Sequence, residues 1–287
     1  MRTVNDLRPD LPADDDQAPE QPPASRPRTG RLSRETLVVR GLQVSVGLLL
    51  LGLWQLAATW KWPDPVLAKS PVQSWDYLVS AAGSGELWSN TRSTMTAVLI
   101  AWVLAGAAGV VAGLALGLMP RTERVLNPYL DAANAMPRIA LAPLLIVALG
   151  IGTSAKVALA ATLVFFIVLS GARAGVRSTD AEWLRLSTVL GARKRQLFLK
   201  VLLPVATPAI FAALRLGLIY SLLGVVGSEL YSARDGLGQL IAYNSSTFQM
   251  DAVYGILVLL AVIAVVLNQL MGFLERRLLR WQPPADR

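Results

Sequence analysis

Long apolar blocks without charged side chains constrain this chain more than any other feature of its sequence. Four blocks contain no Asp, Glu, Lys or Arg: residues 41–60, 93–119, 157–172 and 252–274. A fifth block, residues 205–227, contains Arg215 as its single charge. Because a helix needs about 20 predominantly apolar residues to cross a bilayer, four of these blocks predict spanning helices and residues 157–172 predict a short one.

The composition agrees with a membrane protein and excludes several classes of enzyme. Only 16% of the 287 residues are charged and the mean hydropathy is +0.48, whereas soluble domains carry about 25% charged residues. The chain has no cysteine and no histidine, which excludes disulfides, Cys/His zinc sites and Ser-His-Asp triads. An intramembrane enzyme would have to use carboxylates or Ser and Lys, and no cluster offers such a set.

A sixth apolar block, residues 125–152, is less regular than the others. It is interrupted by three prolines and two charges: Pro128, Asp131, Pro137, Arg138 and Pro143. We predict a broken sixth helix here, because with six spans most of the basic residues fall on the cytoplasmic side of the membrane, as is usual for membrane proteins. The alternative is a re-entrant hairpin, which would invert the orientation of everything that follows.

The two ends of the chain differ from the apolar part. Residues 1–40 contain six prolines, seven arginines and a run of three aspartates, a composition that predicts a disordered cytoplasmic tail. Residues 41–281 then form the membrane domain and residues 282–287 a short C-terminal tail.

The net charge of +8 is explained by membrane topology. With the N-terminus in the cytoplasm, twenty of the 27 Lys and Arg residues lie inside, five lie outside, and Arg138 and Arg215 lie within spans. This bias follows the rule that cytoplasmic loops carry the excess of basic residues. The charge therefore predicts cytoplasmic N- and C-termini, and it gives no reason to expect a nucleic-acid partner.

The second apolar block carries a stripe of small residues at every fourth position: Ala101, Ala105, Gly109, Gly113 and Gly117. Such a stripe lets two helices approach closely in a bilayer. We favour packing within the chain, and a seam between two copies is the alternative.

The segment 174–204 is too polar to span the membrane. Leu186, Val189 and Leu190 recur at helical spacing, and a second apolar stripe begins at Leu197 and Phe198. Between the two stripes lie Gly191-Ala192 and the basic run Arg193-Lys194-Arg195. Because glycine can end a helix in a left-handed conformation, we predict a helix–turn–helix at the membrane face, with its turn toward the cytoplasm.

This segment resembles the "EAA" loop of binding-protein-dependent ABC import permeases. The resemblance lies in Gly191-Ala192, Gln196-Leu197-Phe198 and Val201-Leu202-Leu203-Pro204. The wider pattern is similar to the nitrate/sulfonate/taurine-type branch, through Leu141-Ala142-Pro143-Leu144, Gly150-Ile151-Gly152, Lys156, Leu214-Arg215-Leu216, Glu229, Gly236-Leu237-Gly238 and Trp281. One departure is that Arg185-Leu186-Ser187 stands where the family has Glu-Ala-Ala.

The resemblance implies an all-α membrane protein with the six-helix fold of type I ABC importer permeases and a cytoplasmic coupling helix. It also implies a transport subunit of the bacterial inner membrane with no chemistry of its own. The sequence contains no Gly-x4-Gly-Lys-Ser/Thr phosphate cradle, so ATP and Mg would be bound by a cytoplasmic ATPase dimer. An extracytoplasmic solute-binding protein and a second permease copy, forming a homodimer, would complete the assembly.

The loop residues that would dock on the ATPase are Arg185, Leu186, Ser187, Gly191, Ala192, Arg193, Lys194, Arg195, Phe198 and Pro204. Contact of the basic turn with anionic lipid headgroups is the alternative.

Polar and ionisable residues in or near the spans are candidates for the translocation path: Asp131, Arg138, Arg215, Glu229 and Asn268. Intramembrane charges are costly and usually have partners, so contact with an anionic group of the substrate and structural pairing within the bundle are both open. Asp131 and Arg138 are seven residues apart and would share one face of a continuous helix.

A secondary, ion-coupled transporter is the alternative function. It would need inverted repeats and a coupling-ion site, and we find no convincing repeat. The branch resemblance suggests a small anion, such as a sulfonate, nitrate or a taurine-like compound, carried by alternating access, and nothing in the residues fixes which one.

Overall fold

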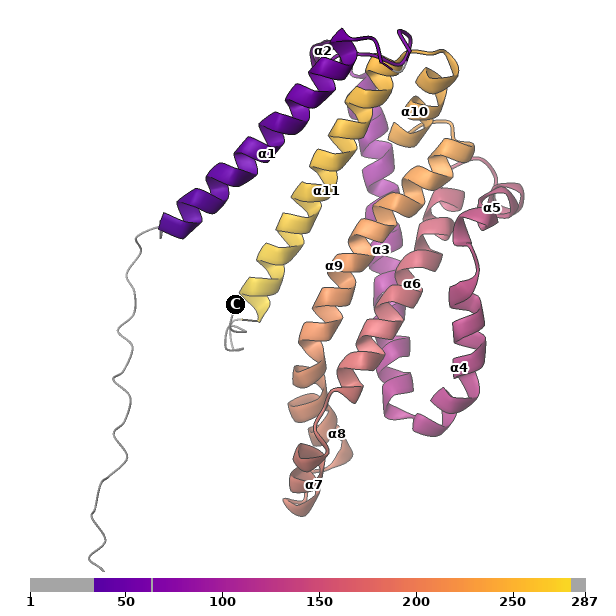
Figure 1. The fold of residues 1–287 in the computed structure, drawn as a ribbon. Helices are drawn as coiled ribbons and strands as arrows, with labels where there is room; N and C mark the ends of the chain where they lie inside the picture. Colours follow the sequence, from indigo (N-terminus) through magenta and orange to yellow (C-terminus); the bar gives the residue numbers. More distant parts are fainter. Residues whose placement is uncertain (1–33, 63, 280–287) are drawn as a thin grey trace, which may run out of the picture. The chain divides into compact units, whose positions relative to one another are not determined.

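The computed structural model describes residues 34–62 and 64–279, and all regular elements in these ranges are helices (Figure 1). They are α1 (Arg34–Thr59), α2 (Pro71–Gly83), α3 (Glu86–Leu118), α4 (Pro120–Ala135), the 3₁₀ turn η1 (Arg138–Leu141), α5 (Ala142–Leu149), α6 (Thr153–Arg177), α7 (Ala181–Val189), α8 (Lys194–Leu197), the π-helical turn η2 (Phe198–Leu202), α9 (Leu203–Tyr231), α10 (Leu237–Ser246) and α11 (Met250–Leu278).

The chain divides into two units, Met1–Leu50 and Leu51–Arg287. In the first unit the described residues form the beginning of α1. Residues 34–40 are therefore helical, which corrects the prediction of a disordered tail up to residue 40. The remainder of that predicted tail, residues 1–33, and the predicted C-terminal tail at 282–287 lie outside the described residues.

The predicted membrane architecture is present in the described residues. Five helices are long and apolar enough to cross a bilayer, and a sixth crossing results if α4 and the η1–α5 segment count as one span. These two segments meet at 81°, because Pro137 interrupts the helix and Met136 before it is extended. The block at 125–152 is thus broken, as predicted.

Helices α3, α6 and α9 lie side by side and form the centre of the second unit (Figure 1). A β-carbon built on Gly113 of α3 would lie only 2.5 Å from the carbonyl oxygen of Leu169, and one on Gly109 would lie 2.8 Å from that of Phe165. Both carbonyl groups belong to α6. The glycines of the small-residue stripe therefore serve packing within the chain, as we favoured.

The three helices are joined by buried apolar side chains. One cluster contains Ala97, Val98, Ala101, Ala160, Leu218, Leu222, Val225 and Met271. Ala97, Val98 and Ala101 follow the face of α3 that also carries the glycines. Most of these side chains are small or branched, so the helices can pack closely, and dispersion contacts hold them.

Two helices that the sequence did not predict lie at the end of the bundle opposite to α7 (Figure 1). Helix α2 begins with a capping box formed by Ser70 and Gln73, followed by Pro71 in the first turn. Helix α10 begins after Gly236 and buries Leu237, Leu240 and Ile241. Both helices pack on α11, so this end of the bundle is covered by short helices instead of loops.

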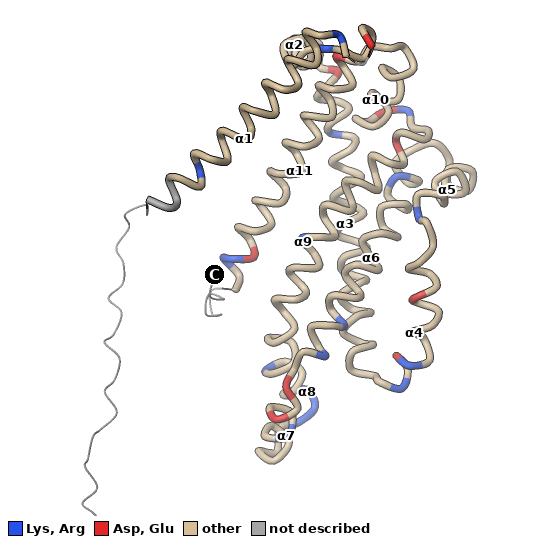
Figure 2. Tube along the Cα trace, in the orientation of Figure 1, with Lys and Arg blue, Asp and Glu red and all other residues tan. Residues whose placement is uncertain are grey.

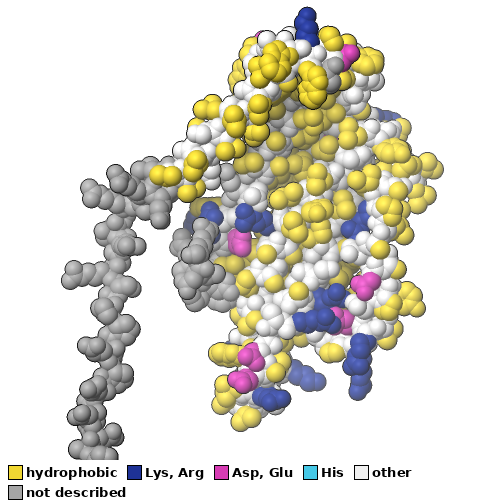
Figure 3. Space-filling view, in the orientation of Figure 1, with side chains coloured by type: hydrophobic (Ala, Val, Ile, Leu, Met, Phe, Trp, Pro, Cys, Tyr) yellow, Lys and Arg dark blue, Asp and Glu magenta, His cyan; other side chains and the backbone are white. Residues whose placement is uncertain are grey.

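Charged residues lie mostly near the two ends of the α3–α6–α9 bundle (Figure 2). Figure 3 shows basic side chains gathered toward the α7–α8 end of the visible face, whereas apolar side chains cover much of its middle. This distribution is typical of a bundle whose middle lies in the hydrocarbon core of a bilayer.

Candidate functional site

The segment between α6 and α9 forms the predicted helix–turn–helix. Asp180 caps α7 by accepting a hydrogen bond from the backbone amide of Glu182. The helix ends at Val189, and Gly191 follows with φ of +73°. A side chain at this φ would be strained, so glycine at position 191 is what lets the chain turn sharply into α8.

Helix α7 presents apolar side chains to its surroundings. Val189 is 84% exposed and Leu190 is 76% exposed. Trp183 and Leu186 are exposed as well, and Arg193, Lys194 and Arg195 lie on the surface after them. Within this chain the stripe predicted from Leu186, Val189 and Leu190 is therefore unburied, an apolar surface beside a basic turn.

The second half of the loop is continuous with a membrane helix. Residues Lys194–Tyr231 run as one helical span, in which α8, η2 and α9 follow one another without a break. The π-helical turn at Phe198–Leu202 ends two residues before Pro204, which has no backbone amide to donate. The sequence had predicted this span to start at residue 205, whereas the structure extends it into the loop.

The base of the loop is anchored in a core cluster of Ala172, Val176, Leu202, Ala206 and Ile210. Leu184 of α7, together with Leu197 and Phe198, packs against this cluster. The α7–α8 turn thus rests on the ends of α6 and α9, and a force on it acts on both helices.

The structure separates two of the predicted path residues that were expected on one helix face. Asp131 lies in α4 and is exposed, whereas Arg138 lies beyond the break and begins η1. The guanidinium of Arg138 instead bonds to Asn134 and stacks over Phe166, 4.7 Å from the ring centre. The expectation of a shared helical face was wrong, because Pro137 ends α4 between the two charges.

Arg215 and Asn268 are brought together by α9 and α11. The Nε of Arg215 donates to Asn268 Oδ1 over 2.7 Å, and its Nη1 lies 3.6 Å from Glu275 Oε2. The guanidinium packs over Gly272. Arg215, Asn268 and Gly272 border a cavity of about 470 Å³, which Gln269 and Arg276 also line.

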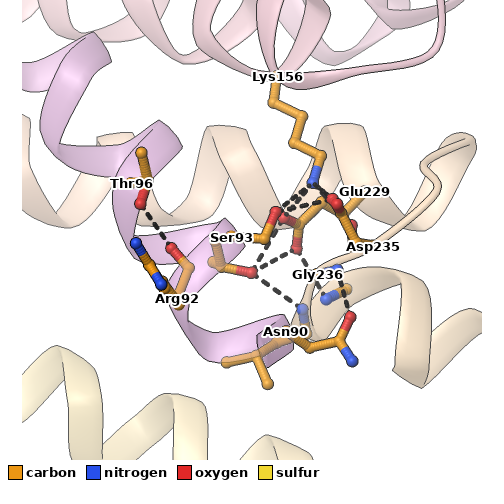
Figure 4. A network of polar contacts seen from close by, with 11 residues as sticks. Asn90, Arg92, Ser93, Thr96, Lys156, Glu229, Asp235 and Gly236 are labelled. Atoms are coloured by element: carbon orange, nitrogen blue, oxygen red, sulfur yellow. Dashed lines mark hydrogen bonds and ion pairs between the residues drawn. The ribbon is translucent and has the colours of Figure 1, made fainter. Parts of the chain in front are cut away.

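Glu229 belongs to a buried polar network (Figure 4). It lies near the end of α9 that is opposite to α7 (Figure 1). The Lys156 Nζ donates to Glu229 Oε1 at 3.1 Å and to Asp235 Oδ1 at 2.7 Å. The side chains of Lys156 and Glu229 are 2% and 0% exposed, whereas Asp235 is 60% exposed. One lysine therefore joins a buried carboxylate to one at the surface.

Further hydrogen bonds complete this network. The hydroxyl of Thr94 donates to Glu229, and the amide of Gly238 donates to Glu229 Oε2. The amide of Gly236 donates to Asn90 Oδ1. Gly236 has φ of +116° and lies against the Glu229 carboxylate, where a β-carbon would collide with it. The Gly236-Leu237-Gly238 segment is thus shaped to close over Glu229.

The exposed member of the network has a shifted pKa. Hydrogen bonds from Lys156 and from Ser93 hold the pKa of the Asp235 carboxyl below its usual value. Asp235 is therefore ionised throughout the neutral range.

Sequence reasoning singled out Glu229 and Lys156 separately and did not connect them. It also missed Asp235, Thr94 and Asn90. One signal was available in the sequence. The isolated Lys156 directly precedes one predicted span and the isolated Glu229 lies just beyond another, so the predicted topology puts both on the same side of the membrane. In the described residues no cluster of three Asp or Glu side chains could hold a metal ion.

The chain matches the model of a protein family over residues 105–280. The family is described as "Binding-protein-dependent transport system inner membrane component". This range contains α4 to α11, and with them the α7–α8 turn, the Arg215 cavity, and Lys156, Glu229 and Asp235 of the buried network.

Curated relatives span most of the chain. The taurine transport system permease protein TauC of Escherichia coli is 31% identical over 84% of this chain and 90% of the relative. The riboflavin transport system permease protein RibX of Chloroflexus aurantiacus is 34% identical over 89% of this chain and 95% of the relative. The formylaminopyrimidine transport permease protein ThiX of Halalkalibacterium halodurans is 27% identical. The names of these relatives cover different solutes.

Solved structures share the fold. An inward-facing methionine ABC transporter, MetNI, matches with a TM-score of 0.55 at 20% identity, over 66% of this chain and 96% of the matched chain. An amino acid ABC transporter determined with histidines matches with a TM-score of 0.54 at 20% identity, over 70% of this chain and 97% of that one. The relatives are transport subunits, which sets aside the ion-coupled carrier and the intramembrane enzyme. The chain therefore belongs to the binding-protein-dependent transport system inner membrane components and is an ABC importer permease with the type I fold.

Proposed function

We propose that this permease carries a small anionic solute into the cytoplasm, and that the α7–α8 turn is its docking site for a cytoplasmic ATPase dimer that binds ATP and Mg. The exposed stripe of Leu186, Val189 and Leu190 carries this proposal. This apolar patch lies next to a basic turn and outside the membrane-spanning segments. An exposed apolar patch of this kind is typical of a surface that binds a partner protein, here in a groove of the soluble ATPase.

The α7–α8 turn is also joined directly to the central helices, so a movement of the turn can be transmitted to them. Its second helix continues into α9 as one span, and its first helix packs through Leu184 on the end of α6. Closure of the ATPase dimer would then move the turn together with two of the three central helices. Alternating access follows if this movement switches the opening of the bundle between the two sides.

The proposed orientation puts both termini and the α7–α8 turn in the cytoplasm of a bacterial cell. The opposite end, with α2, α10 and the Asp235 loop, then faces an extracytoplasmic solute-binding protein. The excess of basic residues on the α7 side supports this orientation.

An anionic solute is proposed on the strength of the Arg215 cavity. Its walls carry Arg215 and Arg276 against the single carboxylate of Glu275 nearby. Arg215 lies inside a span, where an unpaired charge would be costly, yet its side chain is 40% exposed within this chain. A water-filled path shared with a second copy of the permease, in a homodimer, would account for that exposure.

The experiment is a comparison of substitutions at Gly191 in the assembled transporter. Valine at φ of +73° costs roughly 1–2 kcal/mol or more, whereas asparagine tolerates the left-handed region. We expect Gly191→Val to abolish solute-stimulated ATPase activity and uptake, and Gly191→Asn to retain both. Gly85→Val is the matched control, because Gly85 has φ of +80° and equally open surroundings at the other end of the bundle. Normal uptake by Gly191→Val would overturn the docking assignment.

A further inference from the structure

Helix α4 is held to the protein by a buried carboxylate. Glu123 is 3% exposed and is the one buried residue of this helix. The larger apolar side chains of α4 point outward, with Val125 67% exposed and Tyr129 71% exposed. Apolar packing within this chain therefore contributes little to the position of α4.

The partners of Glu123 are two arginines near the end of α6. Its Oε1 lies 2.6 Å from Arg177 Nη2 and 3.4 Å from Arg173 Nε. The side chain of Arg173 is 18% exposed and also bonds to Asn127 of α4. Two guanidinium groups thus form ion pairs with one buried carboxylate, and loss of such a buried partner is costly because it leaves an uncompensated charge.

The position of this cluster along the chain links it to the α7–α8 turn. Arg177 is the last residue of α6, and α7 begins at Ala181. At the other end of α4, Arg138 stacks on Phe166 of α6. Segment 120–138 is thus tied to α6 at both ends, near the turn and at the 81° bend.

We propose that Glu123 is a positioning residue that makes α4 move with α6, so that a displacement of the α7–α8 turn reaches the bend before η1. The inference rests on the proposed role of that turn as the ATPase docking site. Without the carboxylate, α6 still moves with the turn, but near the turn α4 keeps only the hydrogen bond between Asn127 and Arg173 and follows α6 less closely. Energy from ATP hydrolysis is then spent without switching the bundle.

The test is the ratio of solute transported to ATP hydrolysed in proteoliposomes containing the complete transporter. We expect Glu123→Gln to assemble with the ATPase and to lower this ratio about tenfold, a change within the usual range for coupled sites. Arg177→Gln serves as a second variant, because the side chain of Arg177 is 60% exposed and Arg173 remains beside the Glu123 carboxylate; binding of the ATPase verifies that it assembles. Arg121→Gln and Arg124→Gln remove neighbouring exposed charges of α4 and are expected to leave the ratio unchanged.

A distance measurement separates positioning from simple stabilisation. The chain has no cysteine, so spin labels can be placed at the exposed residues Ala132 of α4 and Ala174 of α6. We expect one narrow distance distribution in the nucleotide-free and ATP-trapped states, and a broad one in Glu123→Gln. An unchanged distribution and an unchanged transport ratio in both Glu123→Gln and Arg177→Gln would overturn the inference. A permease that binds the ATPase equally well with Gly191→Val would instead refute the docking role.

Discussion

The ammonium group of Lys156, at the start of α6, lies 3.1 Å from the carboxylate of Glu229, near the end of α9, and both side chains are buried. The two residues are 73 positions apart in the sequence. Each would be a costly isolated charge at this depth, and the pair is tolerated because Thr94 and Gly238 satisfy the remaining acceptor sites of Glu229.

Removal of one partner of this pair should destabilise the protein strongly. Lys156→Met leaves the Glu229 carboxylate buried without its cation, a change that costs about 3–5 kcal/mol. We expect a markedly lower unfolding temperature in detergent, and partial recovery in the double variant Lys156→Met/Glu229→Gln. Arg92→Gln, at an exposed position nearby, is the control. Equal losses in the single and double variants would argue against direct pairing.

The Asp235 contact should make a pH-dependent contribution to stability. The pKa of Asp235 is lower in the folded protein than in the unfolded chain, where it is about 4. Its contribution is therefore present above that unfolded value and is lost as the pH falls through the lower folded value. Because the side chain is 60% exposed, we expect less than about 1 kcal/mol. Unfolding curves of wild type and Asp235→Asn should differ at pH 7 and converge as the pH falls below the lower folded pKa.

The close contact of α3 with α6 should be sensitive to a single methyl group. A β-carbon at Gly113 would lie 2.5 Å from the Leu169 carbonyl oxygen and 2.7 Å from Ala172 Cβ. We expect Gly113→Ala to cost about 1–3 kcal/mol, as overpacking usually does. Gly83→Ala, where nothing lies within 4 Å, should change the unfolding temperature little. A stabilised Gly113→Ala variant would show that the two helices are free to separate.

The role of Arg215 can be tested by comparing two substitutions in its ion pair. If Arg215 contacts an anionic solute, Arg215→Gln raises the KM for uptake, whereas Glu275→Gln frees the guanidinium and lowers or retains the KM. If the pair only supports the helices, both variants lose stability alike and the KM stays unchanged. We expect the first pattern, measured with the solute that the cognate binding protein captures.

The orientation of the chain can be determined with single cysteines, because the native sequence has none. With an impermeant thiol reagent on intact cells, we expect labelling at Ser84 and Ser245 and none at Ser187. Labelling at Ser187 would place the α7–α8 turn outside, refute the six-span topology and remove the ATPase-docking role with it.

Local patterns in the sequence were sufficient to predict several features. The uncharged blocks predicted the spanning helices, the every-fourth-residue stripe predicted close packing, and Gly191 predicted the turn after α7. These features depend on residues within a few turns of one another, so helical periodicity and glycine geometry determine them directly.

The tertiary structure alone decided which charges meet. Asp131 and Arg138 looked like partners by spacing, but the break at Pro137 separates them. Nothing in the sequence pattern singled out Glu123, yet it is buried against Arg173 and Arg177. Such pairs depend on how α4, α6 and α9 pack together. An ion pair at the surface contributes little to stability, whereas a buried charge that loses its partner destabilises the protein strongly. The contribution of these pairs to stability therefore depends on how the helices pack and not on sequence spacing.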